Sequence, residues 1–142
     1  AVSEVGGRYA VHSRGAADVR MLLAKNPASW QEMLAQGDED GETVGPCPPL
    51  VLVLNAQDAD GRDTSWIWDV PFEQLQGRRI HVCGERAEDL ALRLRYAGVE
   101  CSVGGDPLEA ADVLAVRTGA RSIDLLANYT AFQGVRRQLA LS

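Results

Sequence analysis

The sequence has no apolar run long enough to cross a membrane, and it does not open on a basic segment followed by an apolar one. It has only three cysteines, Cys47, Cys83 and Cys101, without paired spacing. That count argues against a disulfide framework and against a cysteine-based zinc site. These absences favour a cytoplasmic protein that does not insert into a membrane.

Positive charge is also scarce. The chain carries 14 lysines and arginines against 20 acids, for a net charge of −6, and Lys25 is its only lysine. An acidic chain is disfavoured for non-specific contact with nucleic acid or an anionic surface, so we expect no nucleic-acid partner. The sequence also has neither a Gly-x-x-x-x-Gly-Lys phosphate loop nor a dinucleotide fingerprint. A nucleotide, if one is used, is therefore held mostly elsewhere.

What the sequence does contain is a regular alternation of strand and helix signals. Its 142 residues, 46% of them apolar, suit one globular domain. Short apolar runs with flanking turn residues are typical of buried strands, and they lie at 19–24, 50–54, 80–83 and 123–127. Alternation around Tyr9 and Val11 predicts a further, half-buried strand.

Helices are predicted between these strands. Asn26-Pro27 and Asp106-Pro107 each place a capping residue before a proline at the first helical position. We expect the first of these helices to end at Gly37, before a polar surface loop over 37–49. Asn128 or Thr130 would cap a last helix. The order predicts an α/β fold, a three-layer Rossmann-like domain with a mostly parallel sheet.

One more helix is predicted over 85–97, between the strands at 80–83 and 123–127. Gly98 ends it, and Asp89 and Arg93 are spaced as an i,i+4 ion pair on its exposed side. His81 and Cys83 share a face of the preceding strand. Strand neighbours rarely reach hydrogen-bond distance, so we do not expect a nucleophilic Cys–His pair there.

Ligands of open parallel sheets bind at the carboxyl ends of the strands, where two weaker candidates lie. Lys25 and Asn26 combine a positive charge with a helix start, and both features favour an anion. An exposed lysine beside an ordinary cap is the more economical interpretation. Asn128 and Tyr129 follow the last strand and have a comparable ambiguity between capping and ligand binding.

The strongest candidate is the stretch 55–69, directly after the strand at 50–54. It holds four acids within twelve residues, with two tryptophans beside them: Asp58, Asp60, Asp63, Asp69, Trp66 and Trp68. An Asp-Gly turn and a capped short helix starting near Thr64 would account for part of this pattern. Carboxylates on an aromatic base also suit orienting a histidine, binding a cation or docking a partner. We expect no metal site, because no histidine is near in sequence.

Four segments of the chain resemble, in the same order, the C-terminal domain of the MurT family. They are residues 23–28, 60–69, 84–94 and 127–130, and the resemblance extends from about Gly7 onward. The most specific is Asp60-Gly61-Arg62-Asp63-Thr64-Ser65-Trp66. Ser29, where the family pattern has Gly, and Pro71, where it has an acid, depart from the resemblance.

The resemblance implies a Mur-ligase-like subunit that works with a GatD-type glutaminase. Such a pair amidates the α-carboxyl of D-glutamate in lipid II to D-isoglutamine, using ATP, Mg²⁺ and ammonia from glutamine. Residues 1–142 would be the C-terminal domain of a longer chain. The ATP-binding central domain and a cysteine zinc site would lie outside it, and the domain alone would be inactive.

The resemblance also implies residue roles. Asp63 would complete the glutaminase's Cys-His-Asp triad, Asp60 and Arg62 would shape its loop, and Trp66 and Trp68 would anchor it. Lys25, Asn26, Asn128 and Tyr129 would lie toward nucleotide or substrate. Two alternatives stay open: the C-terminal domain of an amino-acid-adding Mur or folylpolyglutamate-type ligase, and a docking module without chemistry.

Overall fold

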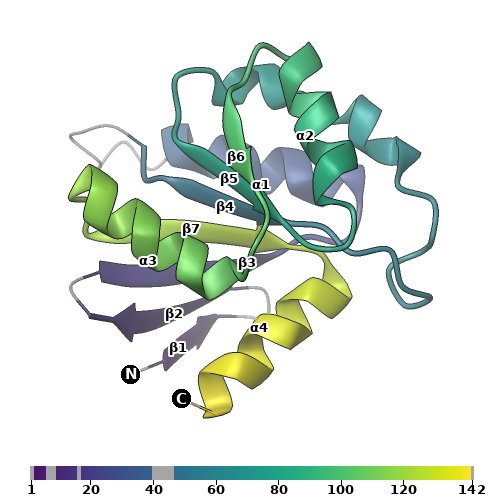
Figure 1. Ribbon diagram of the computed structural model, residues 1–142. Helices are drawn as coiled ribbons and strands as arrows, with labels where there is room; N and C mark the ends of the chain where they lie inside the picture. The colour runs from purple at the N-terminus through teal and green to yellow at the C-terminus, as the bar shows by residue number, and fades with distance from the viewer. Residues whose placement is uncertain (1, 6–8, 16, 40–46, 142) are drawn as a thin grey trace.

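One sheet of seven strands forms the centre of the structure, a computed structural model that describes residues 2–5, 9–15, 17–39 and 47–141 (Figure 1). The strand order is β1-β2-β3-β7-β4-β5-β6. The last five strands in this order run parallel, and β1 and β2 add an antiparallel edge. The strands are β1 (Val2–Val5), β2 (Tyr9–Arg14), β3 (Ala17–Leu23), β4 (Leu50–Val53), β5 (Ile80–Cys83), β6 (Cys101–Val103) and β7 (Ser122–Ala127).

Helices cover both faces of this sheet, which confirms the predicted three-layer α/β fold (Figure 1). One face carries α1 (Pro27–Glu39), α2 (Ala87–Tyr96) and two short 3₁₀ helices, η1 (Ser65–Asp69) and η2 (Phe72–Leu75). The other face carries α3 (Pro107–Thr118) and α4 (Tyr129–Leu141). No helix of the described residues is long and apolar enough to cross a membrane.

The central strand β4 contributes to both hydrophobic cores. Leu50 and Leu52 point to the core under α1 and α2, and Val51 and Val53 point to the core under α3 and α4. All four are at most 3% exposed. Burial on both faces is what its unbroken apolar run predicts. On β2, by contrast, Ala10 is buried and Val11 is only half-buried.

Several predicted element ends were wrong. Helix α1 continues past Gly37 to Glu39, and residues 40–46 of the predicted surface loop lie outside the described residues. Helix α2 begins at Ala87, two residues late, because the chain still turns at Gly84. There φ is +101°, and a Cβ would lie 2.4 Å from the carbonyl oxygen of Leu54. Only glycine permits that approach between the ends of β4 and β5.

Arg93 was predicted to be exposed and is buried instead, with 6% of its surface accessible. Its guanidinium donates to the carbonyl oxygens of Ile67 (3.1 Å) and Val70 (2.7 Å) and pairs with Glu73 (3.0 Å). Asp89 pairs with Arg86. A helix wheel marks Arg93 as polar, whereas the carbonyls at the end of η1 provide the partners that a buried guanidinium needs.

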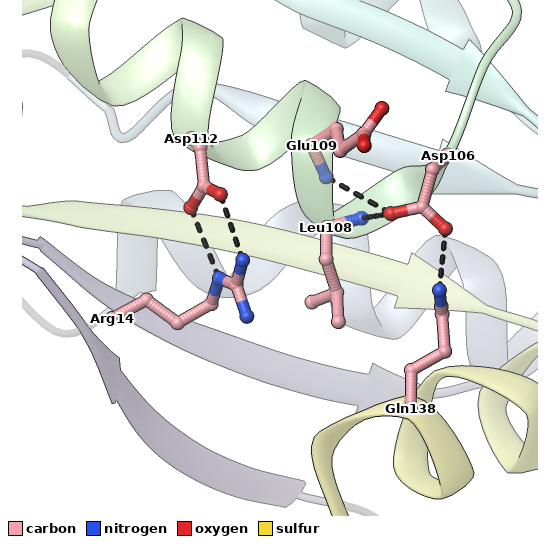
Figure 2. Close-up of polar contacts among 6 residues, drawn as sticks. All are labelled: Arg14, Asp106, Leu108, Glu109, Asp112 and Gln138. Atoms are coloured by element: carbon pink, nitrogen blue, oxygen red, sulfur yellow. Dashed lines mark hydrogen bonds and ion pairs between the residues drawn. The ribbon is translucent and has the colours of Figure 1, made fainter. Parts of the chain in front are cut away.

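Helix α3 has the predicted cap and is tied to two neighbouring elements (Figure 2). The Asp106 carboxylate accepts the amides of Leu108 and Glu109, both at 3.0 Å, and a bond from Gln138 of α4 at 2.6 Å. Farther along α3, Asp112 accepts two bonds from Arg14 of β2. These contacts fix α3 against the sheet edge and against α4.

A buried ion cluster lies at the amino end of the parallel strands. The Asp124 side chain, 3% exposed, accepts two bonds from Arg20 and one from Arg78, at 2.8 to 2.9 Å. Arg78 also donates to the carbonyl oxygen of Pro48 at 2.6 Å. The cluster therefore joins β3, β7 and the segment entering β4.

We expect Asp124→Asn to lower the free energy of unfolding by about 3 kcal/mol, because it removes the buried negative charge that two largely buried guanidinium groups face. Urea denaturation of the isolated domain measures this. Asp112→Asn is the matched control, since its ion pair is partly exposed and should contribute about 1 kcal/mol or less. Equal losses in the two variants would contradict the assignment of Asp124 as the central anion.

Candidate functional site

The acidic loop, residues 55–64, leaves β4 at the carboxyl end of the sheet, beside the first turn of α4 (Figure 1). Its first residue is paired with the end of β7. The Asn55 amide donates to Asn128 Oδ1 (3.0 Å), and Asn128 Nδ2 donates to the Asn55 carbonyl oxygen (2.7 Å). Asn128 is 3% exposed. Its side chain thus holds two strand ends together and does not cap α4.

Asp60 fastens the middle of the loop to α4. Its carboxylate accepts the Thr130 amide (2.8 Å), the Thr130 hydroxyl and the Gln57 amide (3.0 Å). The cap of α4 therefore comes from a residue seventy positions earlier in the chain. The predicted caps, Asn128 and Thr130, were wrong as side-chain caps: Asn128 bonds to Asn55, and Thr130 donates to Asp60. These contacts are those of a residue that shapes the loop.

Glu85 supports the loop from the other side. Its carboxylate accepts the Ala56 amide (3.1 Å), and its own amide donates to Asn55 Oδ1 (3.0 Å). Sequence reasoning missed Asn55, Glu85 and Thr130 as loop contacts. The only available signal was that each lies at the carboxyl end of a strand that the parallel pattern brings together.

Asp63 is exposed near the end of the loop, and its side chain accepts a hydrogen bond from the first residue of η1. Its Oδ1 accepts the Ser65 amide at 2.8 Å. This backbone bond, followed by a bond from the Ser65 side chain, lowers the pKa of Asp63 from its ordinary value. Asp63 is consequently a carboxylate at neutral pH, with one oxygen fixed by the chain and the group open to solvent.

Arg62 pairs with an acid earlier in the loop. Its guanidinium pairs with Asp58 at 2.7 Å, and both side chains are more than three quarters exposed. A surface ion pair of this kind contributes about 0–1 kcal/mol. The ion pair of Arg62 therefore joins two residues of the same loop and contributes little to its stability.

The two tryptophans differ in environment. Trp66 is half-buried against the core, with its ring edge-on to Trp30 at 5.5 Å. Trp68 is 47% exposed and lies edge-on to Tyr96 of α2 at 5.4 Å. Trp66 thus anchors η1 to the core, while Trp68 faces outward.

The residues predicted to face nucleotide or substrate lie partly together. The Lys25 ammonium is 5.0 Å from the centre of the Tyr129 ring. Asn26 caps α1 by accepting the Ser29 amide (2.9 Å), and the Ser29 hydroxyl accepts the amides of Lys25 and Asn26. Three N–H groups that a phosphate would use at this helix start already have partners. Lys25 itself is exposed to solvent.

Cys83 is not set up as a nucleophile. Burial, with a smaller effect from Asp106, raises its pKa to about 12, so it stays a thiol at neutral pH. His81 bonds instead to Ser102 and to the carbonyl oxygen of Gly104, both at 2.6 Å. Across the described ranges, no three His, Cys, Asp or Glu side chains are grouped so that they could hold a metal ion.

The model of one protein family, MurT ligase C-terminal, matches residues 23–132. The chain belongs to this family. The matched region contains all four segments on which the resemblance rested, including the acidic loop.

Curated relatives agree with the family. The chain is 42% identical over 101 residues to the lipid II isoglutaminyl synthase (glutamine-hydrolyzing) subunit MurT of Staphylococcus aureus strain COL, covering 68% of the chain and 22% of that protein. It is 32% identical over 142 residues to the subunit of the same name from Streptococcus pneumoniae, covering 96% of the chain and 31% of that protein. The chain thus spans less than a third of the length of either relative.

We predict that Asp60→Ala loosens the acidic loop, because the amides of Gln57 and Thr130 lose their common acceptor. Removing a helix cap costs about 0.5–2 kcal/mol. Hydrogen exchange at these two amides should accelerate roughly 2- to 30-fold, corresponding to that range. Asp58→Ala, in the same loop but paired only at the surface, is the control. Unchanged exchange in Asp60→Ala would show that Asp60 does not hold the loop.

Because the folded-state pKa of Asp63 is lowered, its hydrogen bond with the Ser65 amide should be fully present above its unfolded pKa of about 3.9 and lost as pH falls through the lowered folded value. An NMR titration of the Ser65 amide in the isolated domain measures this, with the Gly119 amide, which donates to the Ala115 carbonyl oxygen, as an internal reference. A midpoint above about 4 for Ser65 would contradict the assigned hydrogen bond.

Proposed function

We propose that this chain is the C-terminal domain of the ligase subunit that, with a GatD-type glutaminase, amidates the α-carboxyl of D-glutamate in lipid II. The family and the names of its relatives support the reaction class. The single observation that carries the glutaminase role is the acidic loop. It presents one fixed, ionised and exposed carboxylate, Asp63, at the carboxyl end of the sheet.

The histidine that Asp63 serves would come from the partner. The two histidines of this sequence are His12, on β2 between β1 and β3, and His81, whose ring is bonded to Ser102 and Gly104. An exposed carboxylate beside a partner's imidazole would hold its tautomer and stabilise the imidazolium. A positive imidazolium favours the thiolate of a neighbouring cysteine, which is the nucleophile that attacks the glutamine amide.

Asp63 suits this role geometrically. One oxygen, Oδ1, is fixed by the Ser65 amide, which sets the orientation of the carboxylate before any partner arrives. Because a carboxylate is planar, fixing Oδ1 also fixes the direction of Oδ2. Oδ2 can then accept a hydrogen bond from the partner's imidazole. Orientation in advance lowers the cost of forming the assembled site.

The amide-forming step would take place mainly on other parts of the whole enzyme. ATP with Mg²⁺ would activate the substrate carboxyl as an acyl phosphate, which the ammonia released from glutamine then attacks. In this chain, Lys25 can offer a positive charge. The side chains of Asn26 and Ser29 already accept hydrogen bonds from the backbone amides at the start of α1. We therefore propose nucleotide contact for Lys25 and its neighbour Tyr129, and no metal ligand among the described residues.

The decisive test is Asp63→Asn in the full-length subunit, paired with its glutaminase. Asn can still accept the Ser65 amide, so the loop keeps its shape and only the charge is lost. We expect glutamine hydrolysis to fall about 10²- to 10⁴-fold. Amidation supplied with free ammonia bypasses hydrolysis and should continue.

Asp58→Asn, which changes a neighbouring acid paired with Arg62, is the matched control and should retain hydrolysis. Full hydrolysis in Asp63→Asn would rule out the triad role. Loss of both glutamine- and ammonia-driven amidation would instead indicate damage to the ligase side.

A further inference from the structure

An exposed aromatic patch lies a few residues beyond Asp63, formed by Trp68 of η1 with Leu92 and Tyr96 of α2. Their exposed fractions are 47%, 48% and 74%. The rings of Trp68 and Tyr96 are in edge-to-face contact at 5.4 Å, and Leu92 precedes Tyr96 by one helical turn. The structure has other exposed apolar side chains, but among those described only this patch pairs two aromatic rings.

The patch is held rigidly by Arg93 beneath it. The Arg93 guanidinium lies 5.4 Å from the Trp68 ring centre, and it also lies 5.4 Å from the Phe72 ring in the core. The same group donates to the carbonyls of Ile67 and Val70 on either side of Trp68. An exposed tryptophan fixed in this way loses little conformational freedom when a partner covers it.

The patch also lies close to Asp63. Asp63 accepts the amide of Ser65, the first residue of η1, and Trp68 lies in that 3₁₀ helix. At about 2 Å per residue within that helix and at most 3.5 Å per residue before it, the two Cα atoms are no more than about 13 Å apart. Asp63 and Trp68 thus lie close together on one continuous segment.

A partner that reaches Asp63 must cover its surroundings. A stable interface buries about 800 Å² on each partner, which corresponds to a disc of about 16 Å radius. A disc of this size centred on Asp63 extends beyond Trp68. Fixed tryptophan and tyrosine side chains are also the residues that most often dominate interface energies.

We propose that Trp68, Tyr96 and Leu92 form the docking surface for the glutaminase subunit, a proposal that rests on the function proposed above. The partner would present an apolar surface to the two rings, and docking there would place its histidine at Asp63. In this proposal the patch determines the affinity for the glutaminase, and Asp63 determines the rate of glutamine hydrolysis. The two contributions can therefore be separated by experiment.

The test measures binding of the full-length ligase subunit to its glutaminase by calorimetry. Trp68→Ala and Tyr96→Ala should each raise the dissociation constant roughly 10- to 100-fold. Glutamine hydrolysis should then reach half its maximum at a correspondingly higher concentration of partner. Trp68→Phe, which keeps an aromatic ring, should recover most of the affinity.

Tyr96→Ala keeps the test interpretable if Trp68→Ala disturbs η1, because Tyr96 is 74% exposed at the end of α2. Val116→Ala is the matched control: Val116 is an 85% exposed apolar residue of α3, on the other face of the sheet, and its loss should not change the dissociation constant. Asp63→Asn should bind with little loss yet hydrolyse slowly.

Unchanged affinity in both Trp68→Ala and Tyr96→Ala would overturn the docking proposal. So would sedimentation showing that the free subunit dimerises through this patch and that Tyr96→Ala abolishes the dimer. Failure of the proposed function has a different signature, namely full hydrolysis in Asp63→Asn, so the two proposals can fail independently.

Discussion

The contact between the Asp60 carboxylate and the first turn of α4 is the interaction on which the candidate site depends. It gives the acidic loop a fixed end point, because Thr130 and Gln57 both donate to the same carboxylate. It also supplies the cap that the start of α4 would otherwise lack. The position of Asp63, three residues later, therefore depends on a helix that is distant in sequence. The loop is held against the folded domain by these hydrogen bonds.

Three strand ends converge beneath that loop. The Asn55–Asn128 pair joins β4 to β7, and the close approach of Gly84 to Leu54 joins β4 to β5. Glu85 then reaches back to the Ala56 amide. Because β4 is buried on both faces, its end can move little, and the loop that leaves it starts from a fixed point. The site thus combines a rigid base with an exposed tip, a common arrangement for loops that carry function.

The sequence predicts the fold well where one local rule decides the structure. Apolar runs located β4, β5 and β7, and Asp106-Pro107 located the start of α3. It does not predict β6, whose exposed Ser102 and Val103 leave no burial pattern. It also misassigns Arg93 and Asn128, since their partners are carbonyls and amides of distant segments. For the candidate site, the motif points to Asp60 and Asp63, whose functional role stays a prediction. The contacts of Glu85 and Thr130 depend on which strands become neighbours, and that is a property of the assembled sheet.

The cap that Asp60 provides has a consequence for the order in which the molecule is made. Asp60 and Asp63 leave the ribosome long before Thr130, yet the loop is fastened only when α4 has been synthesised and has folded onto the sheet. An incomplete nascent chain would contain the acidic motif without its final geometry. The acidic loop can therefore reach the shape described here only in a chain that already includes α4.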